Sequence, residues 1–102
     1  MIVAVTARLR VRIVLLPTAD GGRRTGIGSG YRPSWRGDRK PDWNDAAIEL
    51  DGTDRLEPGE EAMAWLLLGV PEHWQGRVQP GDVLEAAEGS RLVARADVLA
   101  LE

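Results

Sequence analysis

The sequence has 102 residues, of which 43% are hydrophobic and 28% charged, and its formal net charge is −3 at pH 7. This composition is typical of a folded globular protein and excludes a disordered or membrane-embedded chain. Cysteine is absent, which excludes a disulfide framework, a thiolate nucleophile and a cysteine-based metal site. We therefore expect a cytoplasmic protein with a single domain over residues 1–102.

The first predicted element is a strand over residues 3–16. Arg8, Arg10 and Arg12 alternate there with aliphatic residues, and this period of two is typical of a strand with one buried and one solvated face. The same arginines interrupt the apolar opening, MIVAVTARLRVRIVLL, before it reaches the length of a signal segment. We therefore interpret the opening as part of the mature fold.

The next stretch, GGRRTGIGSGYRP at 21–33, contains five glycines and ends in a proline. Phosphate-binding glycine loops lead into a helix, whose N-terminus favours the anion. Here Pro33 disfavours helical geometry at Arg32, and both the Gly-Lys-Ser/Thr ending and the dinucleotide-binding spacing are missing. A nucleotide loop is therefore disfavoured, which leaves a nucleic-acid contact or a turn-rich crossing between strands.

The remaining predicted elements are short strands. Residues 46–50 (AAIEL) and 62–70 (AMAWLLLGV) are apolar runs bounded by turn signals, although the composition of 62–70 would also suit a helix. A Pro-Gly pair at 80–81 introduces DVLEAAEGS, and a strand over 91–101 closes the chain. Turn signals recur from end to end, which indicates an all-β sandwich or small barrel.

Three ordered motifs resemble the C-terminal β-barrel domain of elongation factor Tu. Gly-Gly-Arg-Arg-Thr at 21–25 and Gly-Tyr-Arg-Pro at 30–33 are similar to that family's Gly-Gly-Arg-x-Thr and Gly-Tyr-Arg-Pro. Pro-Gly-Glu at 58–60 stands where the family has Pro-Gly-Asp, and Glu-Gly-Ser-Arg at 88–91 resembles its Glu-Gly-Gly-Arg. The resemblance spans nearly the whole chain, with a small additional segment at 36–44.

This resemblance implies a closed, antiparallel, six-stranded Greek-key barrel, in which 21–33 is the long loop after the first strand. The glycines of that loop would permit positive backbone torsions and close chain approach. In the family, the barrel helps hold the T stem of aminoacyl-tRNA and contacts the nucleotide-exchange factor, whereas a separate domain binds the nucleotide. The chain departs from the family at residues 26–28, which replace aromatic residues, and at Ala87, which replaces an arginine. The residues expected on this basis to contact a partner or RNA are Arg23, Arg24, Thr25, Tyr31, Arg32 and Arg91.

Charge is distributed unevenly along the chain. Residues 1–40 hold nine basic and two acidic residues, a balance of plus seven, whereas residues 41–102 hold four basic and fourteen acidic residues, a balance of minus ten. The arginines, beside Tyr31, Trp35 and Trp43 as stacking surfaces, are compatible with an RNA contact. The alternatives are solvated or internally paired arginines, or an acidic protein partner.

No catalytic constellation is predicted, and we expect neither a cofactor nor a bound metal. His73 is the single histidine and is interpreted as a surface loop residue, and Trp65 as a core residue. The function predicted from the sequence is a non-enzymatic binding module that engages a protein partner in an accessory, regulatory or immunity-type role. The alternative is a module that binds tRNA or another structured RNA through the arginines of the 21–33 loop. Neither DNA nor a membrane is an expected partner, and Trp43 beside the basic residues of 36–44 is a further candidate contact surface.

Overall fold

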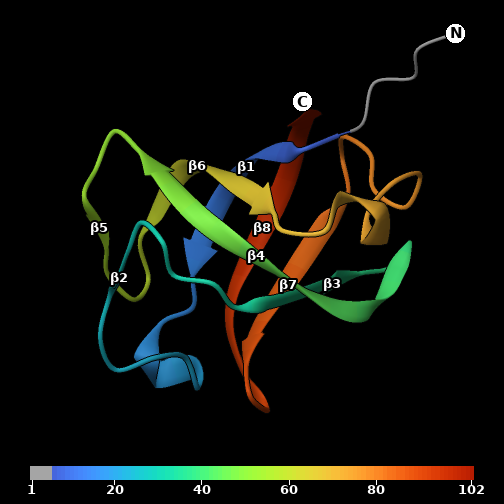
Figure 1. Ribbon diagram of the computed structural model, residues 1–102. Helices are drawn as coiled ribbons and strands as arrows, with labels where there is room; N and C mark the ends of the chain where they lie inside the picture. The colour runs from blue at the N-terminus through green and yellow to red at the C-terminus, as the bar shows by residue number, and fades with distance from the viewer. Residues whose placement is uncertain (1–5) are drawn as a thin grey trace, which may run out of the picture.

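The computed structural model describes residues 6–102, and these form an all-β fold (Figure 1). The strands are β1 (Arg8–Leu15), β2 (Ile27–Gly28), β3 (Ser34–Gly37), β4 (Lys40–Asp51), β5 (Arg55–Leu56), β6 (Glu61–Leu68), β7 (Val83–Glu88) and β8 (Arg91–Leu101). Two single-turn 3-10 helices, η1 (Thr18–Asp20) and η2 (Pro71–His73), lie in the connections. Within the described range, no helix has the length and apolar character needed to cross a bilayer.

Six of the strands close into an antiparallel barrel in the order β1-β6-β4-β3-β7-β8, with β8 pairing back onto β1. β3, β4 and β6 are antiparallel neighbours in chain order, and β1 lies beside β6 rather than beside β3, which is Greek-key topology. β2 and β5 form a separate two-stranded ribbon. The closed, six-stranded antiparallel barrel predicted from the sequence is confirmed.

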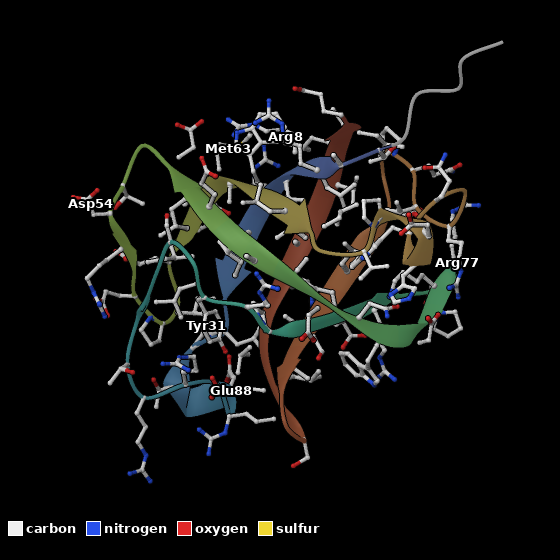
Figure 2. The ribbon with its side chains drawn as sticks, viewed as in Figure 1. Arg8, Tyr31, Asp54, Met63, Arg77 and Glu88 are labelled. Atoms are coloured by element: carbon white, nitrogen blue, oxygen red, sulfur yellow. The ribbon has the colours of Figure 1, made fainter. Side chains whose placement is uncertain are left out.

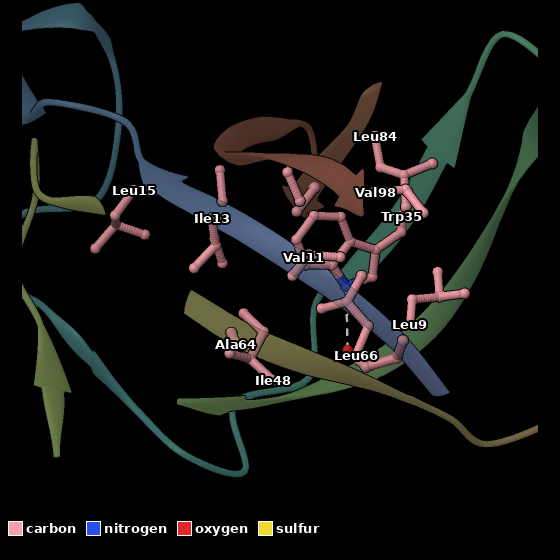
Figure 3. Packing of buried hydrophobic residues seen from close by; sticks show 14 of the residues in the cluster. Leu9, Val11, Ile13, Leu15, Trp35, Ile48, Ala64, Leu66, Leu84 and Val98 are labelled. Atoms are coloured by element: carbon pink, nitrogen blue, oxygen red, sulfur yellow. Dashed lines mark hydrogen bonds between the residues drawn. The ribbon is translucent and has the colours of Figure 1, made fainter. Parts of the chain in front are cut away.

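The interior of the barrel is filled by alternate residues of its strands. In β1, four aliphatic side chains have no exposed surface: Leu9, Val11, Ile13 and Leu15. The arginines between them face outward, as their alternation predicts. Figure 3 shows the aliphatic side chains of β1 beside Trp35, which is also 0% exposed and donates its indole Nε1–H to the Ala46 carbonyl at 3.1 Å. This hydrogen bond satisfies the polar atom of a large core side chain.

Most strand predictions are confirmed, with different boundaries. β1 begins at Arg8 rather than at position 3, and positions 3–5 of that prediction lie outside the described residues. β4 is longer than the predicted 46–50, because its first half forms a hairpin with β3 in which Gly37 pairs with Lys40. The segment 36–44 therefore builds this hairpin. β6 and β8 confirm the strands predicted over 62–70 and 91–101, so the helix alternative for 62–70 is wrong.

The predicted environments of two tryptophans are wrong: Trp65 was expected in the core, and Trp35 was expected on the surface. Trp65 lies on the outer face of β6, half-buried beneath the guanidinium groups of Arg8 and Arg10, whose Cζ atoms are 3.8 and 4.8 Å from the indole centroid. Trp35, expected as an exposed stacking surface, is in the core. The error at Trp65 arose because both faces of β6 carry apolar residues, so its sequence shows no alternation.

The stretch GGRRTGIGSGYRP connects β1 to β3 and contains only the two-residue strand β2. Gly30 has a φ of 98°, a torsion that strains any residue with a side chain. Gly26 packs against β5 so closely that a Cβ would lie 2.6 Å from the Leu56 carbonyl oxygen. The expected positive torsion is confirmed at Gly30, and the expected close approach of the chain is confirmed at Gly26.

Replacing Gly26 with alanine should destabilise the barrel, because the Leu56 carbonyl oxygen, which cannot move aside as the neighbouring Glu57 side chain can, occupies part of the space of the new methyl group. We expect Gly26→Ala to lower the free energy of unfolding by about 1–3 kcal/mol, the usual cost of overpacking. Urea denaturation followed by tryptophan fluorescence measures this change. The matched control is Gly28→Ala, whose Cβ would lie 3.6 Å from its nearest neighbour and which should change stability by less than about 0.5 kcal/mol. Equal effects at the two positions would contradict the packing argument.

Candidate functional site

Ion pairs between the two halves of the chain cancel much of the charge asymmetry seen in the sequence. Four arginines from residues 1–40 pair with carboxylates from residues 41–102: Arg8 with Glu102, Arg10 with Asp51, Arg23 with Glu88 and Arg39 with Asp82. The partners are 41 to 94 positions apart in sequence, so only the fold brings them together. Each such surface pair adds only about 0–1 kcal/mol to stability. Their main effect is to neutralise arginines that would otherwise form a basic surface.

Most of the residues predicted to contact a partner gather around one hollow of about 210 Å³, which we call the Arg23 hollow. It is lined by Arg23, Arg24, Thr25, Glu88 and Arg91. The loop between β1 and β3 supplies the first three residues, and the end of β7 and the start of β8, on either side of the β7–β8 turn, supply the other two. Four of the six predicted residues are therefore brought together, although they lie in two segments far apart in sequence.

Glu88 organises the polar contacts of the Arg23 hollow. Its Oε2 accepts a hydrogen bond from the Tyr31 hydroxyl at 2.7 Å and pairs with the Arg23 guanidinium. Arg23 also donates to the carbonyl and hydroxyl oxygens of Thr25, each at 3.2 Å, and its Cζ lies 4.9 Å from the centre of the Tyr31 ring. Figure 2 shows Tyr31 and Glu88 pointing toward one another. Arg23 is thus held by internal contacts, and Tyr31 packs the loop.

Burial, together with the hydrogen bond to Glu88 and the negative charge of that carboxylate, raises the pKa of Tyr31 to about 12. The nearby Arg23 lowers this pKa, but by less. The two remaining cations of the hollow, Arg24 and Arg91, are exposed and have no ion-pair partner among residues 6–102. They are the basic groups of this hollow that an external anion can reach.

Arg32 lies in a second hollow, away from the other predicted residues. This hollow, of about 350 Å³, is called the Trp43 hollow and is lined by Arg32, Trp43, Asn44, Asp45, Gly69, Val70 and His73. The chain segment before β3 runs beside β4, since the Tyr31 carbonyl accepts the Ile48 N–H at 2.8 Å. Tyr31 contacts Glu88 and Arg23 of the Arg23 hollow, whereas the next residue lines the Trp43 hollow.

Side-chain contacts join the two segments that surround the Trp43 hollow. Asn44 of β4 meets His73 of η2, with 2.9 Å between Nδ2 and Nδ1. Arg77 pairs with Asp42 through both carboxylate oxygens, one of them 3.2 Å from Nη1. Figure 1 shows η2 beside the β3–β4 hairpin, as these contacts require. The β6–β7 connection is thereby fixed against the hairpin, and the hollow lies where they meet.

Beneath the hairpin lies a buried lysine that the sequence analysis did not identify. Lys40 is 1% exposed, donates to the carbonyls of Trp35 and Asp42 at 3.2 and 2.7 Å, and lies 4.3 Å from the centre of the Trp74 ring. Burial lowers the pKa of Lys40, because the charged form loses water. Two carbonyl dipoles and an aromatic face replace that water, and they fix the start of β4.

The Trp43 hollow was only partly foreseeable. Trp43 was identified as a candidate contact residue, and it is 40% exposed with the Arg36 guanidinium 4.6 Å from its ring centre. His73 is exposed, as expected, but lies in η2. Gly69 and Val70 were missed because nothing in their local sequence distinguishes them from an ordinary strand end.

Comparison of the chain with models of known protein families finds no match. Within residues 6–102, no group of three histidine, aspartate or glutamate side chains is placed to hold a metal ion. The arrangement of both hollows suits binding: guanidinium groups, an exposed indole and hydrogen-bonding side chains face solvent on a rigid barrel.

The elevated pKa of Tyr31 gives a direct test of the Glu88 cluster. Between pH 10 and about 12 the tyrosine of the unfolded chain loses its proton while Tyr31 in the fold keeps it, so the free energy of unfolding should fall as pH rises through this range. Because Tyr31 is the only tyrosine, the ultraviolet absorbance of phenolate reports its titration directly. Circular dichroism at each pH verifies that the barrel is intact.

In the Glu88→Gln variant, the midpoint of this titration should move down toward the ordinary value of 10.0. The lost negative charge and the lost hydrogen bond to a carboxylate both act in that direction. Glu72→Gln, an exposed change on η2, should leave the midpoint unchanged. A wild-type midpoint near 10, or one insensitive to Glu88→Gln, would show that the cluster does not form.

Proposed function

We propose that this protein is a non-enzymatic binding module that engages a protein partner, in an accessory or regulatory role. The observation that carries the proposal is the Trp43 hollow, where Trp43 and Val70 are 40% and 45% exposed beside hydrogen-bonding and cationic groups. Exposed tryptophan bordered by arginine is typical of the energetic centres of protein interfaces. The neutralisation of Arg8, Arg10 and Arg23 by carboxylates also favours a protein over a nucleic acid.

The resemblance to the C-terminal barrel of elongation factor Tu supports the same proposal. A closed six-stranded barrel is the fold that the resemblance implies, and in those factors the barrel works by contact within a larger assembly. A cysteine-free chain suits a reducing compartment, so we place this function in the cytoplasm. The proposal is non-enzymatic, and in it the single histidine, His73, serves as a contact of the Asn44 amide.

An RNA-binding function is the second candidate, and the Arg23 hollow is the observation that favours it. Arg24 and Arg91 are exposed there without ion-pair partners within the described part of the chain, beside the Thr25 hydroxyl. Two guanidinium groups at one hollow can contact neighbouring phosphates of a folded RNA. This candidate ranks second because Glu88 places a negative charge in the same hollow.

The two functions can be separated by their dependence on salt. We expect the tagged barrel to retain a specific protein from nuclease-treated extract of its own cells at both low and high salt, because an interface with an apolar centre is only weakly screened. Reconstitution with the purified partner and calorimetry should then give a defined stoichiometry.

In parallel, fluorescence anisotropy of labelled bulk tRNA is measured with the wild type, an Arg24→Gln/Arg91→Gln variant and an Arg12→Gln control. We expect no tight binding of tRNA. The protein-binding proposal would be overturned if no protein is retained while tRNA binds with a steep salt dependence. In that outcome the double variant should reduce the logarithmic salt slope by about two, one for each lost phosphate contact.

A further inference from the structure

The Trp43 hollow is held in a fixed shape by the contacts that surround it. The Asn44–His73 contact and the Arg77–Asp42 pair fix its two sides. A preformed site of this kind binds without the entropic cost of ordering loops.

The hollow has an apolar part that is open to solvent. Trp43 remains 40% exposed although Arg36 stacks on it, and Val70 is 45% exposed. Gly69, which also lines the hollow, carries no side chain to fill it. A large aliphatic or aromatic side chain that covers Trp43 and Val70 would remove this apolar surface from water.

The hollow also has a cationic part. Arg32 lines it, Arg36 adjoins it through Trp43, and neither guanidinium has an ion-pair partner within residues 6–102. The carboxylate that lines the hollow, Asp45, already accepts the Ser34 hydroxyl at 2.7 Å, and Asp42 beside it is paired with Arg77. The guanidinium groups of Arg32 and Arg36 are therefore left without a carboxylate partner, and the ligand that complements them is a carboxylate.

We propose that the Trp43 hollow binds an extended segment of a partner protein in which an aspartate or glutamate adjoins a large apolar residue. The carboxylate pairs with Arg32, and the apolar side chain covers Trp43 and Val70. This inference rests on the proposed protein-binding function and adds the chemistry that the partner presents. It assigns the specificity of recognition to Arg32, which none of the internal ion pairs uses.

The test is nuclear magnetic resonance titration of the isotope-labelled chain with two capped hexapeptides, Gly-Glu-Leu-Glu-Leu-Gly and its control Gly-Lys-Leu-Lys-Leu-Gly. The glutamate peptide should shift the signals of Gly69, Val70 and the Trp43 indole in a saturable way, and the lysine peptide should leave them unchanged. Arg32→Gln should weaken binding of the glutamate peptide about tenfold, since a charge-assisted hydrogen bond is lost. Trp43→Ser and Val70→Asn should each weaken it as well, and Arg12→Gln should leave it unaltered.

The proposal is overturned if the glutamate peptide causes no shifts, if the shifts occur elsewhere on the barrel, or if binding is insensitive to Arg32→Gln. Dispersed spectra of each variant establish that it folds, and Val70→Asn preserves the test if Trp43→Ser does not fold. The capture experiment distinguishes failure of this inference from failure of the proposed function. A protein retained equally by the wild type and by Arg32→Gln places the interface outside this hollow, whereas a wild type that binds tRNA and retains no protein overturns the function itself.

Discussion

Closure of the sheet is the constraint on which the rest of this structure depends. β1 pairs on one side with β6 and on the other with β8, so the first and last barrel strands meet and no edge strand is left in the six-stranded sheet. Closure sets which side chains face inward, and every inward position of β1 is then buried. Closure also places segments from opposite halves of the sequence side by side. The β1–β3 connection therefore lies against the β7–β8 turn, and the β6–β7 connection lies against the β3–β4 hairpin.

The electrostatics of the surface follow from that closure. Acidic residues of the second half of the chain come close to basic residues of the first half. Ion pairs such as Arg10–Asp51 and Arg23–Glu88 then form on the surface of the barrel. Individually these exposed pairs contribute little stability. Collectively they decide which arginines stay available to another molecule. The two hollows differ in this respect, because Glu88 forms an ion pair with Arg23 in the Arg23 hollow, whereas Asp45 forms none with Arg32 in the Trp43 hollow.

The sequence predicted the fold better than it predicted the surface. Strand β1 was recognisable because its arginines and aliphatic residues alternate, and β8 because turn residues precede it. The bounds of β3 could not be predicted, since four residues, Ser-Trp-Arg-Gly, are too few to show a period. The environments of Trp35 and Trp65 depend on which face of its strand each residue occupies. In β6, which is apolar on both faces, the face of Trp65 is set only by the pairing register with the neighbouring strands. The grouping of Arg23 with Arg91 followed from the motifs, but the separation of Arg32 from Tyr31 depends on how their segment lies against β4.

The burial of Lys40 has a consequence for the chemistry of the folded surface. It is the only lysine in the sequence and is 1% exposed, with its amine bonded to two carbonyls and covered by Trp74. The folded barrel therefore offers reagents and enzymes no lysine side chain to acylate, so attachment of acetyl or ubiquitin groups to a lysine requires the β3–β4 hairpin to open. Acylation of Lys40 accordingly reports local unfolding of this hairpin, and its rate measures how often the region that shapes the Trp43 hollow comes apart.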